Sequence, residues 1–170
     1  MPRRLIERCQ PDSIREFRAA ARERFEDGLW LAAAGRRTGA IYLWGYAAEM
    51  TLKAAYFALR GVADTAVLTW NGHIQPAINR GRAAPLNIAW PSQGAGHNVR
   101  AWAELLTAER SLATATAYTA PFGRDVQRSG QRIGRLWREI LRYHKNVAYS
   151  HEVQQVRDAA EWLLTHSDAL

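Results

Sequence analysis

The segment of residues 39–60 most constrains the fold, because it predicts a helix that is apolar on almost every side. At 100° per residue, apolar side chains spaced three and four apart line one face of this helix. They are Ile41, Trp44, Ala48, Leu52, Ala55 and Leu59. The opposite face carries Leu43, Tyr46, Met50 and Phe57, which leaves no broad polar side. Such a helix belongs either in a membrane or at the centre of a helical bundle.

Two charged residues in the middle of this segment favour the bundle. Glu49 and Lys53 would each cost several kcal/mol in hydrocarbon, and the segment is rich in Ala rather than Leu. We therefore expect no membrane association, but a central helix that packs on its own chain by one face and on a second copy by the other, as a homodimer. Glu49 and Lys53, four residues apart, should form an ion pair. The residues expected in this core and dimer helix are Tyr46, Glu49, Met50, Lys53 and Phe57.

The rest of the chain predicts further helices and no convincing strand, so the fold class is all-α. Helices are expected at about 13–34, 39–60, 97–112, 125–144 and from 150 onward. Residues 62–96 are punctuated by Gly, Pro and Asn-Gly, which predicts a loop-rich insert with a short helix near 74–79. The length suits one domain over residues 1–170.

Composition narrows the partners and the compartment. The net charge is +7, which favours polyanionic partners. Cys9 is the lone cysteine, and the first ten residues hold no apolar signal segment, so a cytoplasmic location is expected. The five histidines show no metal-binding spacing, and no phosphate loop or dinucleotide motif occurs. We therefore expect no metal and no cofactor.

Basic residues recur every three or four positions along the helix expected at 125–144. They are Arg124, Arg128, Arg132, Arg135, Arg138, Arg142 and Lys145. On a regular helix they would share one side. That side is either a solvated outer face or a row that follows a nucleic-acid backbone, since Arg pairs with phosphate oxygens in a bidentate manner. Like charges four residues apart repel unless an anion docks there, which tilts the interpretation slightly toward nucleic acid.

Four landmarks in order resemble the HEPN family (higher eukaryotes and prokaryotes nucleotide-binding). After the long first helix and its short turn come Gly45-Tyr46-Ala47-Ala48-Glu49 with Leu52-Lys53-Ala54, then Gly96-His97-Asn98-Val99 with Leu105-Leu106, and then Trp137 through Arg142-Tyr143. The resemblance implies a four- to five-helix up-and-down bundle that usually dimerises and that engages RNA or nucleotides. The alternative is a non-catalytic interaction module that pairs with a nucleotidyltransferase or another partner protein.

Many members of this family are metal-independent ribonucleases of the toxin or phage-defence kind, with an Arg and a His a few residues apart. Arg138 and His144 have that spacing. The resemblance implies that the Arg steadies the scissile phosphate and that the His transfers a proton. About two such matches are expected by chance in a chain this rich in Arg, and the two side chains would lie about 120° apart on a regular helix. The alternative for His144 is packing or capping at the end of a helix.

Overall fold

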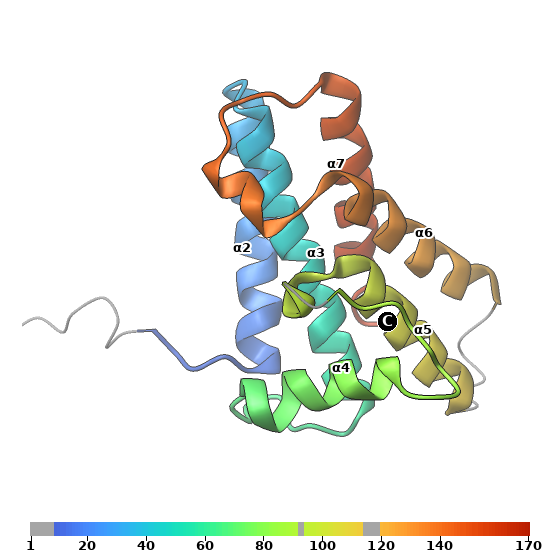
Figure 1. Ribbon diagram of the computed structural model, residues 1–170. Helices are drawn as coiled ribbons and strands as arrows, with labels where there is room; N and C mark the ends of the chain where they lie inside the picture. The colour runs from blue at the N-terminus through green and yellow to red at the C-terminus, as the bar shows by residue number, and fades with distance from the viewer. Residues whose placement is uncertain (1–8, 92–93, 114–119) are drawn as a thin grey trace, which may run out of the picture.

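The computed structural model describes residues 9–91, 94–113 and 120–170, and its regular elements there are all helical (Figure 1). In chain order they are α2 (Ile14–Ala33), α3 (Arg37–Leu59), the π-helical turn η1 (Trp70–Ile74), α4 (Gln75–Arg82), the 3-10 turn η2 (Ala95–His97), α5 (Val99–Leu112), α6 (Ala120–Leu136), the 3-10 turn η3 (Glu139–Tyr143) and α7 (Ser150–Thr165). The prediction of an all-α bundle is confirmed.

Helix α3 is the centre of this bundle. It packs against α2, α5, α7 and η3, while α4 lies across one end (Figure 1). Trp44 and Leu52 are completely buried, and Phe57 nearly so. Tyr46 and Met50 are partly covered. The face of α3 that was expected to meet a second copy is therefore covered in part by elements of the same chain: Phe57 is buried there, while Leu43, Tyr46 and Met50 stay partly exposed.

The start of α3 is held by a segment from far along the chain. Gly35, with a φ of +73°, makes the left-handed turn that lets α2 end there. The Thr38 hydroxyl accepts hydrogen bonds from the backbone N–H groups of Val147 and Ala148, at 2.8 and 3.0 Å. The Asn146 side-chain oxygen accepts one from the Thr38 backbone N–H at 3.0 Å. Residues 146–148 are thereby fixed on the first turn of α3, where the N–H groups have no partner within the helix.

The helix expected at 125–144 is wrong in its second half, because α6 ends at Leu136. The next residue, Trp137, buries its indole against α3, and its Nε1 donates to the Tyr42 carbonyl oxygen at 3.0 Å. Gly45 makes room for this ring, since a Cβ there would lie 2.1 Å from it. Arg138 is extended, with a φ of −146°. A contact made across the fold, rather than a local helix breaker, thus ends the helix.

The insert at 62–96 contains the expected short helix, which extends over Gln75–Arg82 as α4. Its described residues pack onto the bundle, with Ile78 fully buried. Trp90 is also buried, donates to the Ala95 carbonyl oxygen and meets Trp102 edge to face at 5.3 Å. Trp90 therefore anchors the insert beside the start of α5.

Candidate functional site

The structure does not bring the predicted catalytic pair together. Arg138 lines a cleft that it shares with His97, whereas His144 lines a different depression together with Tyr42 and Arg142. The turn η3 lies between these two residues in the chain. Because α6 ends at Leu136, the two residues do not share a regular helix, and the angle of about 120° expected from one does not describe them.

The predicted basic row is divided in the same way. Arg124, Arg128, Arg132 and Arg135 remain on α6, and all four are exposed. Arg128 is paired there with Asp125, with Nη1 3.1 Å from Oδ1. Past the end of α6, Arg138, Arg142 and Lys145 are exposed on the segment that includes η3. The seven side chains therefore do not lie along one helix, although Arg135 and Arg138 still line one depression together.

A cleft of about 510 Å³ opens where η2 meets the end of α6. The residues that line it are Ala89, Trp90, Pro91, Gly94, His97, Asn98, Val99, Gly134, Trp137, Arg138 and Glu139. It contains an imidazole, a guanidinium and a carboxylate, which are the groups that proton transfer and phosphate binding require. Of these three, only Arg138 was predicted as a site residue.

His97 is held in this cleft by a buried carboxylate. Its Nδ1 lies 3.0 Å from Oε2 of Glu49, which is 2 % exposed. Glu49 Oε1 also accepts from Lys53 Nζ at 2.5 Å, so the ion pair predicted from the sequence is confirmed. The hydrogen bond to Glu49 raises the pKa of His97 above its ordinary value, against the opposing effect of burial. Because Glu49 holds Nδ1, Nε2 is the nitrogen through which His97 can exchange a proton with a ligand.

Aromatic rings pack beside this histidine. The Tyr46 ring packs edge to face against His97, with ring centres 5.7 Å apart. The same Tyr46 ring also packs edge to face against Trp137, with ring centres 5.2 Å apart. Burial raises the pKa of the Tyr46 hydroxyl well above its usual range, so it stays neutral. The His97 side chain keeps an exposed fraction of 41 % beside these rings, so a ligand in the cleft can reach it.

A second depression, of about 450 Å³, continues the cleft along α5 and α6. The two share Ala89, Asn98, Gly134 and Arg138, so we treat them as one groove and call it the α5–α6 groove. The second depression adds Arg100, Gln131 and Arg135. Its described lining contains three arginines and no acidic side chain, which gives this end of the groove a positive charge.

Two of these arginines have partners within the described residues. Arg138 donates to the Gly134 and Trp137 carbonyl oxygens and so caps the end of α6. Arg100 pairs with Glu104 at 2.7 Å on the exposed side of α5. These contacts hold the guanidinium groups of Arg138 and Arg100 in place, and Arg135 is exposed on α6.

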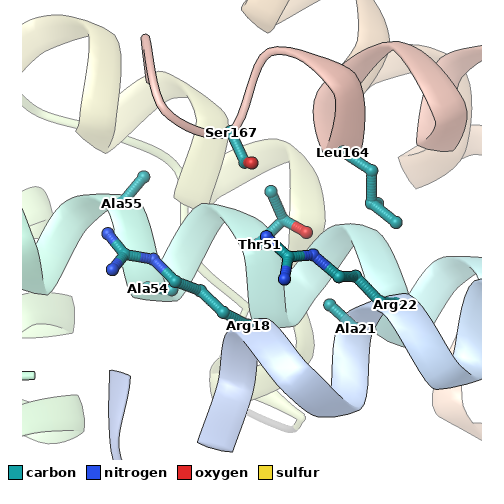
Figure 2. Close-up of a pocket in the computed structure, with 8 residues that line it drawn as sticks. All are labelled: Arg18, Ala21, Arg22, Thr51, Ala54, Ala55, Leu164 and Ser167. Carbon is teal, nitrogen blue, oxygen red and sulfur yellow. The ribbon is translucent and has the colours of Figure 1, made fainter. Parts of the chain in front are cut away.

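A much smaller void lies between α2, α3 and the end of α7 (Figure 2). Arg18 and Arg22 extend along it from α2, with Thr51 of α3 and Ser167 opposite (Figure 2). Its volume is about 20 Å³, which is room for about one water molecule. We regard it as a packing gap rather than a ligand site.

Neither a metal cluster nor a membrane span is found in the described parts of the chain. Within residues 9–91, 94–113 and 120–170, no three His, Cys, Asp or Glu side chains gather in a way that could hold a metal ion. No helix in those ranges combines the length and the apolar character that crossing a bilayer needs.

Comparison with known proteins adds no relative. No family model, curated protein or solved structure matches this chain. The groove and the resemblance seen in the sequence are therefore the basis for inferring a function.

Proposed function

We propose that this chain is a HEPN-like protein that binds RNA or nucleotides through phosphates in the α5–α6 groove and cleaves RNA without a metal ion. One observation carries this proposal: three arginines line a groove that also contains a histidine held by a buried carboxylate. The resemblance to the HEPN family points to the same class of ligand.

Phosphate binding follows from the charge and the shape of the groove. Arg100, Arg135 and Arg138 come from α5, from α6 and from the residues just after α6, so their guanidinium groups surround one depression. Guanidinium groups bind phosphate oxygens through two parallel hydrogen bonds. Asn98 and Gln131 add neutral hydrogen-bonding groups along the same wall. Phosphates fit this lining, because three guanidinium groups and two neutral hydrogen-bonding side chains surround one depression without an acidic side chain among its described lining.

Cleavage would use the RNA's own 2′-hydroxyl as the nucleophile. Glu139 takes the 2′-hydroxyl proton, the 2′ oxygen bonds to phosphorus, and the bond from phosphorus to the 5′ oxygen breaks. His97 Nε2 gives its proton to that leaving oxygen, so the products are a 2′,3′-cyclic phosphate and a 5′-hydroxyl. Arg138 stabilises the negative charge that grows on the phosphate. The raised pKa of His97 suits a proton donor near neutral pH.

Two other predictions from the sequence, a homodimer and a role as a non-catalytic module, remain predictions. A homodimer is still implied by the resemblance, but its interface would lie outside the buried parts of α3. Pairing with a nucleotidyltransferase, as a non-catalytic module, would leave the groove without a role in cleavage.

The decisive experiment compares His97→Ala with His144→Ala on a mixed RNA pool, with and without chelator. We expect the parent to cleave RNA regardless of chelator, and His97→Ala to reduce the rate by about 10²- to 10⁴-fold. His144→Ala is the matched control and should retain the parent rate. If only His144→Ala lost cleavage, the catalytic residues would be Arg138 and His144, the pair predicted from the sequence. RNA left intact by the parent would instead support the interaction module.

A further inference from the structure

A second basic depression lies on the other side of η3. Its volume is about 290 Å³, and it shares no lining residue with the α5–α6 groove. The side chains around it are Leu31, Arg36, Thr38, Gly39, Tyr42, Leu141, Arg142, His144, Lys145 and Asn146. This described lining includes three cationic side chains and no acidic one, so it attracts anions.

Two exposed tyrosines belong to the same stretch of chain. Tyr143 is 73 % exposed and Tyr149 is 67 % exposed. The Arg142 guanidinium lies 4.6 Å from the centre of the Tyr143 ring. Tyr149 stacks on His151 with ring centres 5.9 Å apart and planes 9° apart. We call Tyr143 and Tyr149, with the cations Arg36, Arg142 and Lys145, the η3 platform.

The backbone beneath the platform is fixed rather than loose. Asn146 bridges the turn before α3, because its Oδ1 accepts from the Thr38 N–H at 3.0 Å and its Nδ2 donates to the Gly35 carbonyl oxygen at 2.9 Å. Glu152 accepts from the Tyr149 N–H at 2.7 Å and so fixes the start of α7. Rings presented on a fixed backbone lose little conformational entropy when a ligand binds.

We propose that the η3 platform binds unpaired bases of single-stranded RNA. Exposed aromatic rings interleaved with cations are the features that bind single strands without strong sequence preference, since bases stack on the rings and phosphates meet the cations. A polyanion is favoured over a protein partner, because the described lining beside these rings has three cationic side chains and no acidic one. Every base has a flat face, so we expect no strong preference among the four.

The platform extends the proposed function to a longer stretch of the same strand. Arg138 lines the groove and Arg142 belongs to the platform. The two are four residues apart and joined by η3, so a rise of about 2 Å per residue in a 3-10 helix separates them by roughly 8 Å along the backbone. One strand can therefore lie in the groove and continue over η3 onto the platform.

The test uses two probes of about ten nucleotides, a length within the range that one single-strand site covers. One is a 2′-O-methyl oligouridylate, which cannot be cleaved through its 2′ oxygen, and the other is an abasic oligomer of equal length and charge. The parent should bind the probe with bases more tightly, by about 5-fold or more for each stacked base. Tyr143→Ala and Tyr149→Ala should reduce this preference while leaving affinity for the abasic probe unchanged.

Control variants separate the platform from the groove. Tyr143→Phe should keep the preference, because the ring remains. Trp30→Ala removes an equally exposed ring on α2, outside the stretch that carries Tyr143 and Tyr149, and it should have no effect. Equal binding of both probes by the parent, with a loss in Arg135→Glu, would overturn the platform and leave the proposed function standing. No binding of either probe would overturn both.

Discussion

At the scale of single residues, Glu49 is the group on which the chemistry of the groove depends. It is a buried carboxylate with two cationic neighbours, Lys53 on its own helix and His97 from η2. Lys53 also lies 5.5 Å from the centre of the Trp102 ring, in a largely apolar setting. A charge in such a place is tolerated only when it is well paired. Glu49 therefore both fixes the His97 ring and keeps its proton available.

The first prediction is that Glu49→Gln lowers the pKa of His97. The neutral amide cannot stabilise the imidazolium as the carboxylate does, so the pKa should fall back toward, or below, its ordinary value of 6.5. The measurement is an NMR titration of the His97 ring, with Glu104→Gln on α5 as the control. The single variant also leaves Lys53 buried without its counter-charge, at a cost of about 3 kcal/mol or more. If the single variant does not fold, the double variant Glu49→Gln/Lys53→Met is titrated instead, because it also removes the buried charge of Lys53. An unchanged His97 pKa would contradict the role given to Glu49.

The same contact should be visible in the pH dependence of stability. The pKa of His97 is higher in the folded chain than in the unfolded chain, so the contact stabilises fully below about pH 6.5. This contribution is lost as the pH rises through the folded-state pKa. Urea unfolding of the parent and of His97→Gln should therefore differ most at low pH and converge at high pH.

Sequence reasoning predicted half of this cluster. The pairing of Glu49 with Lys53 follows from their spacing of four residues on one helix, and the structure confirms it. His97 was placed only at the entry to a helix, because it lies 48 residues from Glu49 and no periodic pattern relates the two. A buried Glu in an all-round apolar helix did give a signal, since one neighbouring Lys satisfies only part of a carboxylate.

At the scale of elements, the break between α6 and η3 decides which side chains form the groove. Because α6 ends at Leu136, Arg138 lies on the extended residue after it and lines the cleft together with His97. In the sequence, the basic residues keep their spacing of three or four through the residues of η3. This spacing is compatible with a 3-10 helix as well as with an α-helix, because a 3-10 helix has about three residues per turn. The sequence pattern alone therefore could not reveal the break. The burial of Trp137 beside Gly45, a contact between distant parts of the chain, decides it.

The second prediction tests that contact through Gly45→Ala. A methyl group there would lie 2.1 Å from the Trp137 ring, so the indole must move out of its site. We expect a loss of about 2 kcal/mol or more in the free energy of unfolding, measured with urea. Gly39→Ala on the same helix is the control, because its nearest neighbour is the end of the Leu31 side chain at 3.2 Å. Equal stability of the two variants would contradict the close packing of Trp137 on Gly45.

At the scale of the whole molecule, the apolar surface of α3 is explained largely by packing within the chain. The sequence showed correctly that this helix has no polar side, but it could not show how many neighbours the chain itself supplies. Helices α2, α5 and α7 together with η3 cover it. The net charge of +7 is then the main property that the molecule presents to a partner. Charge of this kind attracts nucleic acid over long distances, with or without a specific site.

The last prediction separates a specific groove from that general attraction by the salt dependence of RNA binding. A probe of about four nucleotides, whose three phosphodiesters meet the three groove arginines, should show a log–log slope near −2, at about 0.7 for each phosphate of a single strand. Its affinity should then fall roughly 20-fold between 50 and 200 mM salt. Arg135→Glu should reduce the slope by about 0.7 or more, whereas Arg124→Glu, on the same helix but outside the groove, should leave it unchanged. If the two variants weakened binding equally, RNA would be held by the exposed arginines of α6 as a whole, and the groove would have no special part in binding.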